Sequence, residues 1–209
     1  MVRAGGNDST DGGDMMTKAQ WRKRLLAARA DVPMARRVAE AASLVRSLTS
    51  LPEVDVVCGY LPFGTEPGSI ALLDELRRTG RTVLLPVIPD VPGPLEWAAY
   101  TGSGDLVPGR LRGVLEPAGE RLGVTAVASA GLVLVPALAV DHRGVRLGRG
   151  AGYYDRSLEL AADAELIALV RDDEFVPELP TEPHDVRMNG VLLPDGGWVR
   201  TPTARPGAS

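Results

Sequence analysis

The chain has 209 residues, of which 44% are hydrophobic and 24% are charged, as in an ordinary globular protein with one sizeable core. Its formal net charge of −4 argues against a dedicated nucleic-acid binder, which would carry a basic face. The one cysteine, Cys58, excludes an internal disulfide framework and fits a reducing cytoplasm, and no apolar run reaches the length that spans a bilayer. We therefore expect a cytoplasmic protein that binds neither nucleic acid nor membrane.

The N-terminal third is predicted to begin with a tail and two helices. Residues 1–16 are rich in Gly, Asp, Asn and Ser, which predicts a disordered tail. Apolar residues then recur at helical spacing, which predicts one helix from residue 17 to the Asp31-Val32-Pro33 break and a second helix over 34–48.

The rest of the chain alternates short apolar runs with helical patterns. Strands are predicted over 54–60, 82–87, 95–100, 130–135, 166–170 and 188–193, and helices over 69–78 and 150–162. This alternation predicts an α/β fold, a three-layer α/β/α arrangement with a mostly parallel sheet, in one domain over 17–198 with a flexible tail at 199–209. Ligands of such sheets bind outside the carboxyl ends of the strands, so the loops there should converge on one cleft.

One glycine-rich run between a predicted strand and a predicted helix carries the most chemical information. It reads Leu147-Gly148-Arg149-Gly150-Ala151-Gly152-Tyr153-Tyr154-Asp155-Arg156. Glycines allow close backbone approach to a ligand, a helix N-terminus favours anions, and Arg146 and Arg149 add forked donors for phosphate oxygens. The run matches neither the dinucleotide-binding nor the Walker glycine pattern, and a purely structural turn is the alternative interpretation.

Four stretches resemble the 5-formyltetrahydrofolate cyclo-ligase family, and they occur in the family's order. They are Lys18-x-x-x-Arg22, Gly59-Tyr60-Leu61-Pro62-Phe63-Gly64-Thr65-Glu66, the segment from Val135-Pro136 through Asp141, Gly144 and Arg146 to Arg156, and Pro183-His184-Asp185-Val186. The resemblance implies a fold like that of sugar-phosphate isomerases and coenzyme A transferases. It also implies ATP- and Mg²⁺-dependent cyclisation of 5-formyltetrahydrofolate to 5,10-methenyltetrahydrofolate by a monomer that binds reduced folate and ATP.

The resemblance also implies a set of site residues. Arg149 is implied to be catalytic, by stabilising charge on the transferred phosphoryl group. Asp155 and Asp185 are implied to be magnesium ligands, although Asp155 could be an ordinary first-turn acid and Asp185 an ordinary loop acid. The implied ATP-binding residues are Lys18, Arg22, Arg146, Leu147, Gly148, Arg149, Gly150, Ala151, Gly152, Tyr153 and Tyr154. The implied folate-binding residues are Tyr60, Glu66, Arg149, Gly150, Gly152 and Tyr153.

The chain departs from the family pattern before Gly113, where the family commonly has an aromatic residue and this chain has Arg112. If that aromatic residue stacks on the ligand, this chain is expected either to use another surface, Trp97 or Tyr60, or to bind the ligand more weakly. Glu116 is expected to shape the pocket, and the two histidines, His142 and His184, are expected to be structural.

Two rival functions remain open from the sequence. One is a non-catalytic folate- or nucleotide-binding protein. The other is a sugar-phosphate isomerase or an acyl-coenzyme A transferase on the same architecture, for which Glu66 or Glu116 could serve as the nucleophile.

Overall fold

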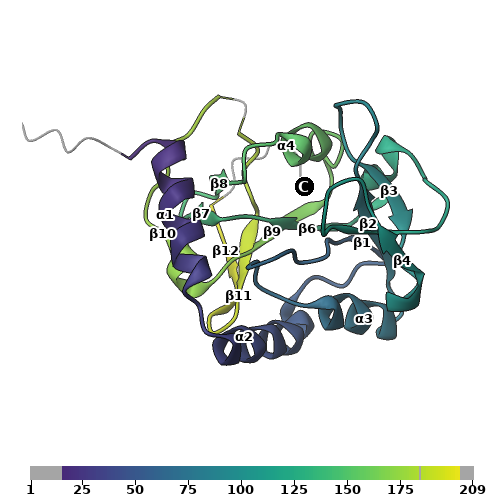
Figure 1. The fold of residues 1–209 in the computed structure, drawn as a ribbon, viewed down its shortest axis with the longest axis horizontal. Helices are drawn as coiled ribbons and strands as arrows, with labels where there is room; N and C mark the ends of the chain where they lie inside the picture. The colour runs from purple at the N-terminus through teal and green to yellow at the C-terminus, as the bar shows by residue number, and fades with distance from the viewer. Residues whose placement is uncertain (1–15, 184, 203–209) are drawn as a thin grey trace, which may run out of the picture.

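The computed structural model describes residues 16–183 and 185–202. Its centre is a seven-stranded sheet in which the inner pairings are parallel and the two edge pairings are antiparallel (Figure 1). The predicted α/β class with a mostly parallel sheet is therefore confirmed. From edge to edge the strands are β12 (Gly197–Arg200), β11 (Gly190–Leu193), β9 (Glu165–Leu169), β6 (Leu132–Pro136), β1 (Val56–Cys58), β2 (Thr82–Val87) and β3 (Glu96–Ala99).

Helices cover both faces of this sheet. α2 (Met34–Ser47) and α3 (Ile70–Arg78) lie on the face that is lowest in Figure 1, and α4 (Tyr153–Leu158) lies on the opposite face. Because strand side chains alternate between the two faces, the core is divided into two layers. Leu44 and Leu73 from the helices belong to one layer, and Leu158 belongs to the other. The described residues also form four short 3-10 helices: η1 (Leu48–Ser50), η2 (Ser103–Asp105), η3 (Val124–Ser129) and η4 (Asp172–Glu174).

The first helix, α1 (Lys18–Ala30), packs against a second, small sheet. Thr17 caps it, because its hydroxyl accepts from the backbone N–H of Gln20 while the Gln20 side chain accepts from the N–H of Thr17. Leu25 packs into a separate apolar cluster with Leu138 and Val145. The small sheet has the strand order β10 (Phe175–Val176), β7 (Ala139–Asp141) and β8 (Arg146–Leu147).

A hairpin of β4 (Leu106–Pro108) and β5 (Leu115–Pro117) forms a third sheet beside β2. Its turn, residues 109–114, reaches the mouth of the pocket described below. None of the helices in the described part of the chain has the length and apolar character needed to cross a bilayer.

The structure corrects the sequence prediction at two elements. The helix predicted over 150–162 is limited to the six residues of α4, because Gly150 and Gly152 have φ of +97° and +71° and only tight turns follow Leu158. The tail predicted from 199 begins too early, because β12 continues to Arg200 and the Thr201 hydroxyl donates to the Met188 carbonyl at 2.6 Å. The rest of both predicted tails, residues 1–15 and 203–209, lies outside the described residues.

Candidate functional site

A pocket of about 460 Å³ opens at the carboxyl ends of β1 and β6, where the sequence predicts the ligand cleft. Loops from distant parts of the chain meet there, so the expectation that they converge on one cleft is confirmed. Residues of the predicted site that line it are Tyr60, Glu66, Arg146, Gly148, Arg149, Gly150, Ala151, Gly152, Tyr153, Tyr154 and Asp155. Residues that the sequence analysis did not select form most of the apolar wall: Leu61, Phe63, Ile88, Leu95, Leu111, Val114, Pro136, Ala137 and Leu138.

The glycine loop over 148–152 forms one wall and is bordered by arginines. Arg22, from α1, donates through Nε to the Gly148 carbonyl at 3.0 Å. A Cβ at Gly150 would lie 3.3 Å from the Arg22 guanidinium carbon, in addition to the strain of the positive φ there. The cations therefore lie directly against the loop backbone. Because α4 has only six residues, these side chains, and not a helix dipole, provide most of the positive charge.

Glu66 joins the glycine loop to the loop that follows β1. Its Oε1 accepts from Arg149 Nε at 3.0 Å, and its Oε2 accepts from the backbone N–H of Phe63 at 3.0 Å. The Glu66 side chain is 9% exposed and the Arg149 side chain 43% exposed, so the carboxylate lies deep in the pocket and the guanidinium lies at the surface. A deep carboxylate of this kind can accept hydrogen bonds from N–H donors of a bound ring.

Two tyrosine hydroxyls are buried beside this carboxylate. The hydroxyls of Tyr60 and Tyr154 have no hydrogen-bond partner among residues 16–183 and 185–202. Burial, with a further contribution from the negative charge of Glu66, raises the pKa of both hydroxyls well above its usual range. Both hydroxyls therefore remain protonated at neutral pH. Because an unpaired buried hydroxyl carries a free-energy cost, each is suited to form a hydrogen bond with a ligand. Tyr153 also lines the pocket, with the Arg156 guanidinium 5.5 Å from the centre of its ring.

Each predicted magnesium ligand is paired with a predicted phosphate ligand. Asp155 forms an ion pair with Arg146, and both oxygens of Asp185 accept from Lys18 Nζ at 2.9 Å. Burial lowers the pKa of Lys18, but the carboxylates of Asp185 and Glu182 outweigh it and the net shift is upward. Lys18 and Asp185 themselves lie outside the pocket lining.

The carboxylates suit a hard cation, provided that other oxygens complete its coordination. No cluster of three or more His, Cys, Asp or Glu side chains arranged for a metal occurs in the described ranges. Mg²⁺ is commonly held by one or two carboxylates together with water and substrate phosphates. Asp155 and Asp185 are consistent with that kind of site, and they do not form a metal cage made of protein alone.

The other described residues to which the sequence analysis gave a role lie in the core or at its edge. Leu147 is buried in the apolar cluster under α1 and outside the pocket lining. Glu116 is buried and accepts from the N–H of Ile88 at 3.1 Å, which supports its expected role in shaping the pocket. The ring of His142 packs on Phe175 with centroids 4.7 Å apart, as expected of a structural histidine, whereas His184 lies outside the described residues.

Of the two residues expected to offer a stacking surface, Tyr60 lines the pocket and Trp97 does not. The side chain of Trp97 is 0% exposed, because it packs in the same layer of the core as Leu158. Phe63 is the exposed aromatic residue at the mouth, and a Cβ added to Gly113 would lie 3.0 Å from its ring. Arg112 lies at the same mouth. Phe63 lies in the motif between Tyr60 and Glu66, and this position could have identified it as a residue of the site from the sequence.

Comparisons with known proteins identify the family of the chain. The model of the 5-formyltetrahydrofolate cyclo-ligase family matches residues 14–194. A 5-formyltetrahydrofolate cyclo-ligase of Mycolicibacterium smegmatis is 49% identical over 189 residues, which cover 88% of this chain and 96% of that protein. The Escherichia coli enzyme of the same name is 31% identical over 158 residues, which cover 73% of this chain and 86% of that protein.

A solved structure shows the same fold. The solution structure of Aquifex aeolicus 5,10-methenyltetrahydrofolate synthetase superimposes with a TM-score of 0.76 at 24% identity, covering 93% of this chain and 97% of that one. The sequence match over most of the chain and the shared fold lead to one conclusion. This chain belongs to the 5-formyltetrahydrofolate cyclo-ligase family and is an enzyme of the ligase class.

Proposed function

We propose that the enzyme cyclises 5-formyltetrahydrofolate to 5,10-methenyltetrahydrofolate in an ATP- and Mg²⁺-dependent reaction through a phosphorylated formyl intermediate, releasing ADP and phosphate. The observation that carries the proposal is the meeting of a deep carboxylate, Glu66, with a glycine loop bordered by arginines in one pocket. A reaction between a folate and a triphosphate needs both kinds of surface side by side. The monomeric state and cytoplasmic location stay predictions from the sequence.

The folate is proposed to bind on the Glu66 side of the pocket. A pterin ring presents several N–H donors along one edge, and these suit the Glu66 carboxylate. The unpaired hydroxyls of Tyr60 and Tyr154 lie near the same carboxylate and can satisfy further polar atoms of the ring. The apolar wall and Phe63 would cover the ring faces.

The triphosphate is proposed to lie along the glycine loop. Arg146 and Arg149 line the same wall, and Arg22, which lies outside the pocket lining, is hydrogen-bonded to the loop backbone. Three guanidinium groups are therefore close to the loop proposed for the phosphates. Lys18 projects from the same helix as Arg22, one turn earlier. In this arrangement Lys18 and Arg146 would exchange their present carboxylate partners for phosphate oxygens.

Asp155 and Asp185 are proposed to hold the magnesium ion. An Mg²⁺ ion held by these carboxylates would supply positive charge to neutralise the phosphates. If Lys18 and Arg146 turn to phosphate, the two carboxylates that they neutralise become available as oxygen ligands.

The proposed chemistry has two steps. The formyl oxygen attacks the γ-phosphorus, forming a new O–P bond while the P–O bond to ADP breaks. Nitrogen 10 then attacks the formyl carbon, the C–O bond breaks to release phosphate, and nitrogen 10 loses its proton. An amide-like oxygen is a weak nucleophile, so alignment by the pocket and charge neutralisation by Arg149 must supply the acceleration.

The rival functions receive no support from the site geometry. A coenzyme A transferase needs an accessible nucleophilic glutamate. Glu66 is held by Arg149 and by the N–H of Phe63, and Glu116 is buried and bonded to Ile88. A non-catalytic folate binder would need only the Glu66 side of the pocket.

The experiment that tests the proposal follows the absorbance of methenyltetrahydrofolate formed from 5-formyltetrahydrofolate, with ATP and magnesium each present or omitted. A rise that requires both supports the proposed reaction. Binding of both ligands without a rise would identify a non-catalytic binder. A rise without ATP would contradict the phosphorylated intermediate.

A further inference from the structure

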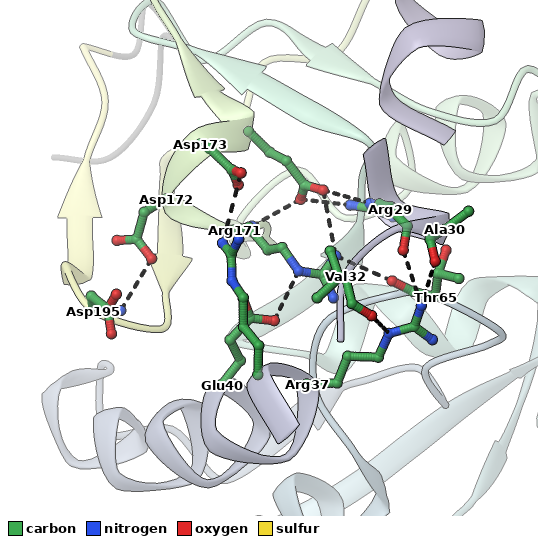
Figure 2. A network of polar contacts seen from close by, with 12 residues as sticks. Arg29, Ala30, Val32, Arg37, Glu40, Thr65, Arg171, Asp172, Asp173 and Asp195 are labelled. Atoms are coloured by element: carbon green, nitrogen blue, oxygen red, sulfur yellow. Dashed lines mark hydrogen bonds and ion pairs between the residues drawn. The ribbon is translucent and has the colours of Figure 1, made fainter. Parts of the chain in front are cut away.

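A second polar cluster lies in the interior beside the pocket, and the proposed reaction makes no direct use of it. It consists of Arg29, Glu40, Arg171 and Glu174, whose side chains are at most 8% exposed. Arg29 Nε lies 2.6 Å from Glu174 Oε1, and Arg171 Nε lies 2.8 Å from Glu40 Oε2. The network can be followed from Glu40 to Thr65 in Figure 2. We call these four residues the arginine–glutamate cluster.

The cluster connects three separate elements. Arg29 is in the last turn of α1 and Glu40 is on α2. Arg171 directly precedes η4, and Glu174 is the last residue of η4. Desolvating four charges is expensive, and an apolar cluster of similar volume is often as stable. Stability alone therefore does not explain why charged groups occupy this position. The two guanidinium groups also contact neutral atoms of the backbone.

Those neutral atoms are two backbone carbonyls, one of a residue that lines the pocket and one of a residue next to Glu66. Arg171 Nη1 donates to the carbonyl of Thr65 at 3.2 Å, and Arg29 Nη2 donates to the carbonyl of Ala137 at 2.7 Å. Thr65 directly precedes Glu66, and Ala137 lines the pocket. The cluster therefore holds the backbone of two segments that contribute to the pocket, one of which carries Glu66.

Arg149 holds the side chain of Glu66 from outside the loop, but the other described hydrogen bonds of Phe63 and Glu66 are local. Glu66 N–H donates to the Phe63 carbonyl at 3.2 Å, and Phe63 N–H donates to Glu66 Oε2, so these bonds lie within the loop itself. The contact from Arg171 to Thr65 comes from outside the loop and from a residue that η4 and α2 hold in place. A planar guanidinium fixes several directions at once, which a lysine ammonium cannot do.

We infer that Arg171 is a positioning residue for Glu66. It fixes the Thr65 carbonyl and so sets the depth at which the Glu66 carboxylate faces the folate, while Glu40 and Glu174 hold the Arg171 guanidinium. This inference rests on the proposed function, in which Glu66 binds the folate.

The test is Arg171→Lys in the full-length enzyme, assayed with 5-formyltetrahydrofolate and MgATP. Lysine keeps the charge but cannot hold Glu40, Glu174 and Thr65 together. The KM for folate should rise about tenfold, while the KM for ATP and kcat change less than about twofold. The matched control is Arg36→Gln, which removes the other partner of Glu40, 2.7 Å away, without touching Arg171 or the pocket. Its kinetic constants should remain those of the unmodified enzyme.

A milder variant covers the case in which Arg171→Lys does not fold. Glu40→Gln preserves shape and weakens the support of Arg171, so the KM for folate should rise several-fold while the KM for ATP is unchanged. Equal changes in both KM values, or a folded Arg171→Lys enzyme with the original KM for folate, would overturn the inference.

A double variant separates positioning from a general structural effect. If Arg171 acts through Glu66, adding Arg171→Lys to Glu66→Gln should change the KM for folate by less than about twofold beyond the single variant. Additive effects would show that Arg171 does not act through Glu66.

Hydrogen exchange distinguishes failure of this inference from failure of the proposed function. If Glu66→Gln alone leaves folate binding intact, the proposed role of Glu66 is wrong. Amide exchange over 62–68 still tests the positioning: it should be faster in Arg171→Lys than in Arg36→Gln, and equal rates would refute the hold on Thr65.

Discussion

The Nε atom of Arg149 lies 3.0 Å from Oε1 of Glu66, a residue 83 positions earlier in the chain. This contact joins the loop proposed for phosphate to the carboxylate proposed for folate. An exposed guanidinium and a deep carboxylate thus neutralise each other until ligands compete for them. The two substrates are therefore expected to influence each other through this pair, and substitution of either residue should have a distinct kinetic effect.

Glu66→Gln should weaken folate binding. The amide keeps the size of the side chain but loses the charge that strengthens hydrogen bonds from pterin N–H groups. We expect the KM for 5-formyltetrahydrofolate to rise about 10- to 100-fold, with the KM for ATP unchanged or lower because Arg149 is released. Steady-state kinetics with each substrate varied provide the measurement. Glu178→Gln, an exposed acid paired with Arg143, serves as the control. An unchanged folate KM would contradict the assignment.

Arg149→Ala should mainly reduce turnover. Its charge matters most when negative charge redistributes on the transferring phosphoryl group, and loss of such a donor typically costs about 100- to 1,000-fold in kcat. Arg149→Lys should restore part of the rate, because it keeps the charge without the fork. Single-turnover formation of the methenyl product measures the step directly. Arg78→Ala, on the outer surface of α3, is the control. Near-normal turnover in Arg149→Ala would remove Arg149 from the catalytic set.

The sequence predicted every strand of the main sheet except β12, and the helices α2 and α3, because their apolar patterns are long enough to be read. The strand predicted over 82–87, which is apolar apart from Thr82, is β2 with the same bounds. The helix predicted over 69–78 is α3, which begins one residue later. The strands that were missed are short. β8 and β10 have two residues each, too few for a period of two to be visible.

The site was predicted by motif and completed by structure. The residues of the glycine loop and Glu66 could be named from the motifs, but the ion pair between Glu66 and Arg149 depends on how two distant loops fold back. Likewise, the pairing of Asp185 with Lys18 spans 167 positions. The arginine–glutamate cluster has no local sequence signature at all, since isolated charges usually indicate solvated surface.

Asp185→Asn should raise the magnesium requirement. The amide is a poorer ligand for a hard cation than the carboxylate, so the magnesium concentration for half-maximal activity should rise about tenfold. Folate binding measured without ATP and magnesium should not change. Glu182→Gln is the matched control, because Glu182 also contacts Lys18 at 2.9 Å but is not a proposed ligand. The same magnesium dependence in Asp185→Asn and the unmodified enzyme would exclude Asp185 as a ligand.

The buried thiol of Cys58 should make the enzyme less stable in alkali. Burial in the core raises the pKa of Cys58 from its ordinary value of 9.0 to about 12. Below pH 9 the thiol is protonated in both folded and unfolded chains and contributes no pH dependence. Between pH 9 and about 12 only the unfolded chain loses the proton, so the free energy of unfolding falls as the pH rises through this window.

Urea unfolding at a series of pH values from 8 to 11 measures this effect by comparison with Cys58→Ala, because the window in which the thiol titrates opens at 9.0. The alanine variant should be less stable at pH 8, since it leaves a small cavity in the core. Its free energy of unfolding should then fall less steeply with pH than that of the unmodified enzyme, and the two curves should converge. Burial also raises the pKa of Tyr60, and this contribution is the same in both proteins and cancels in the difference. Parallel curves over the whole range would show that the thiol ionises as readily in the folded chain as in the unfolded one, and the core around β1 would then have to admit water at Cys58.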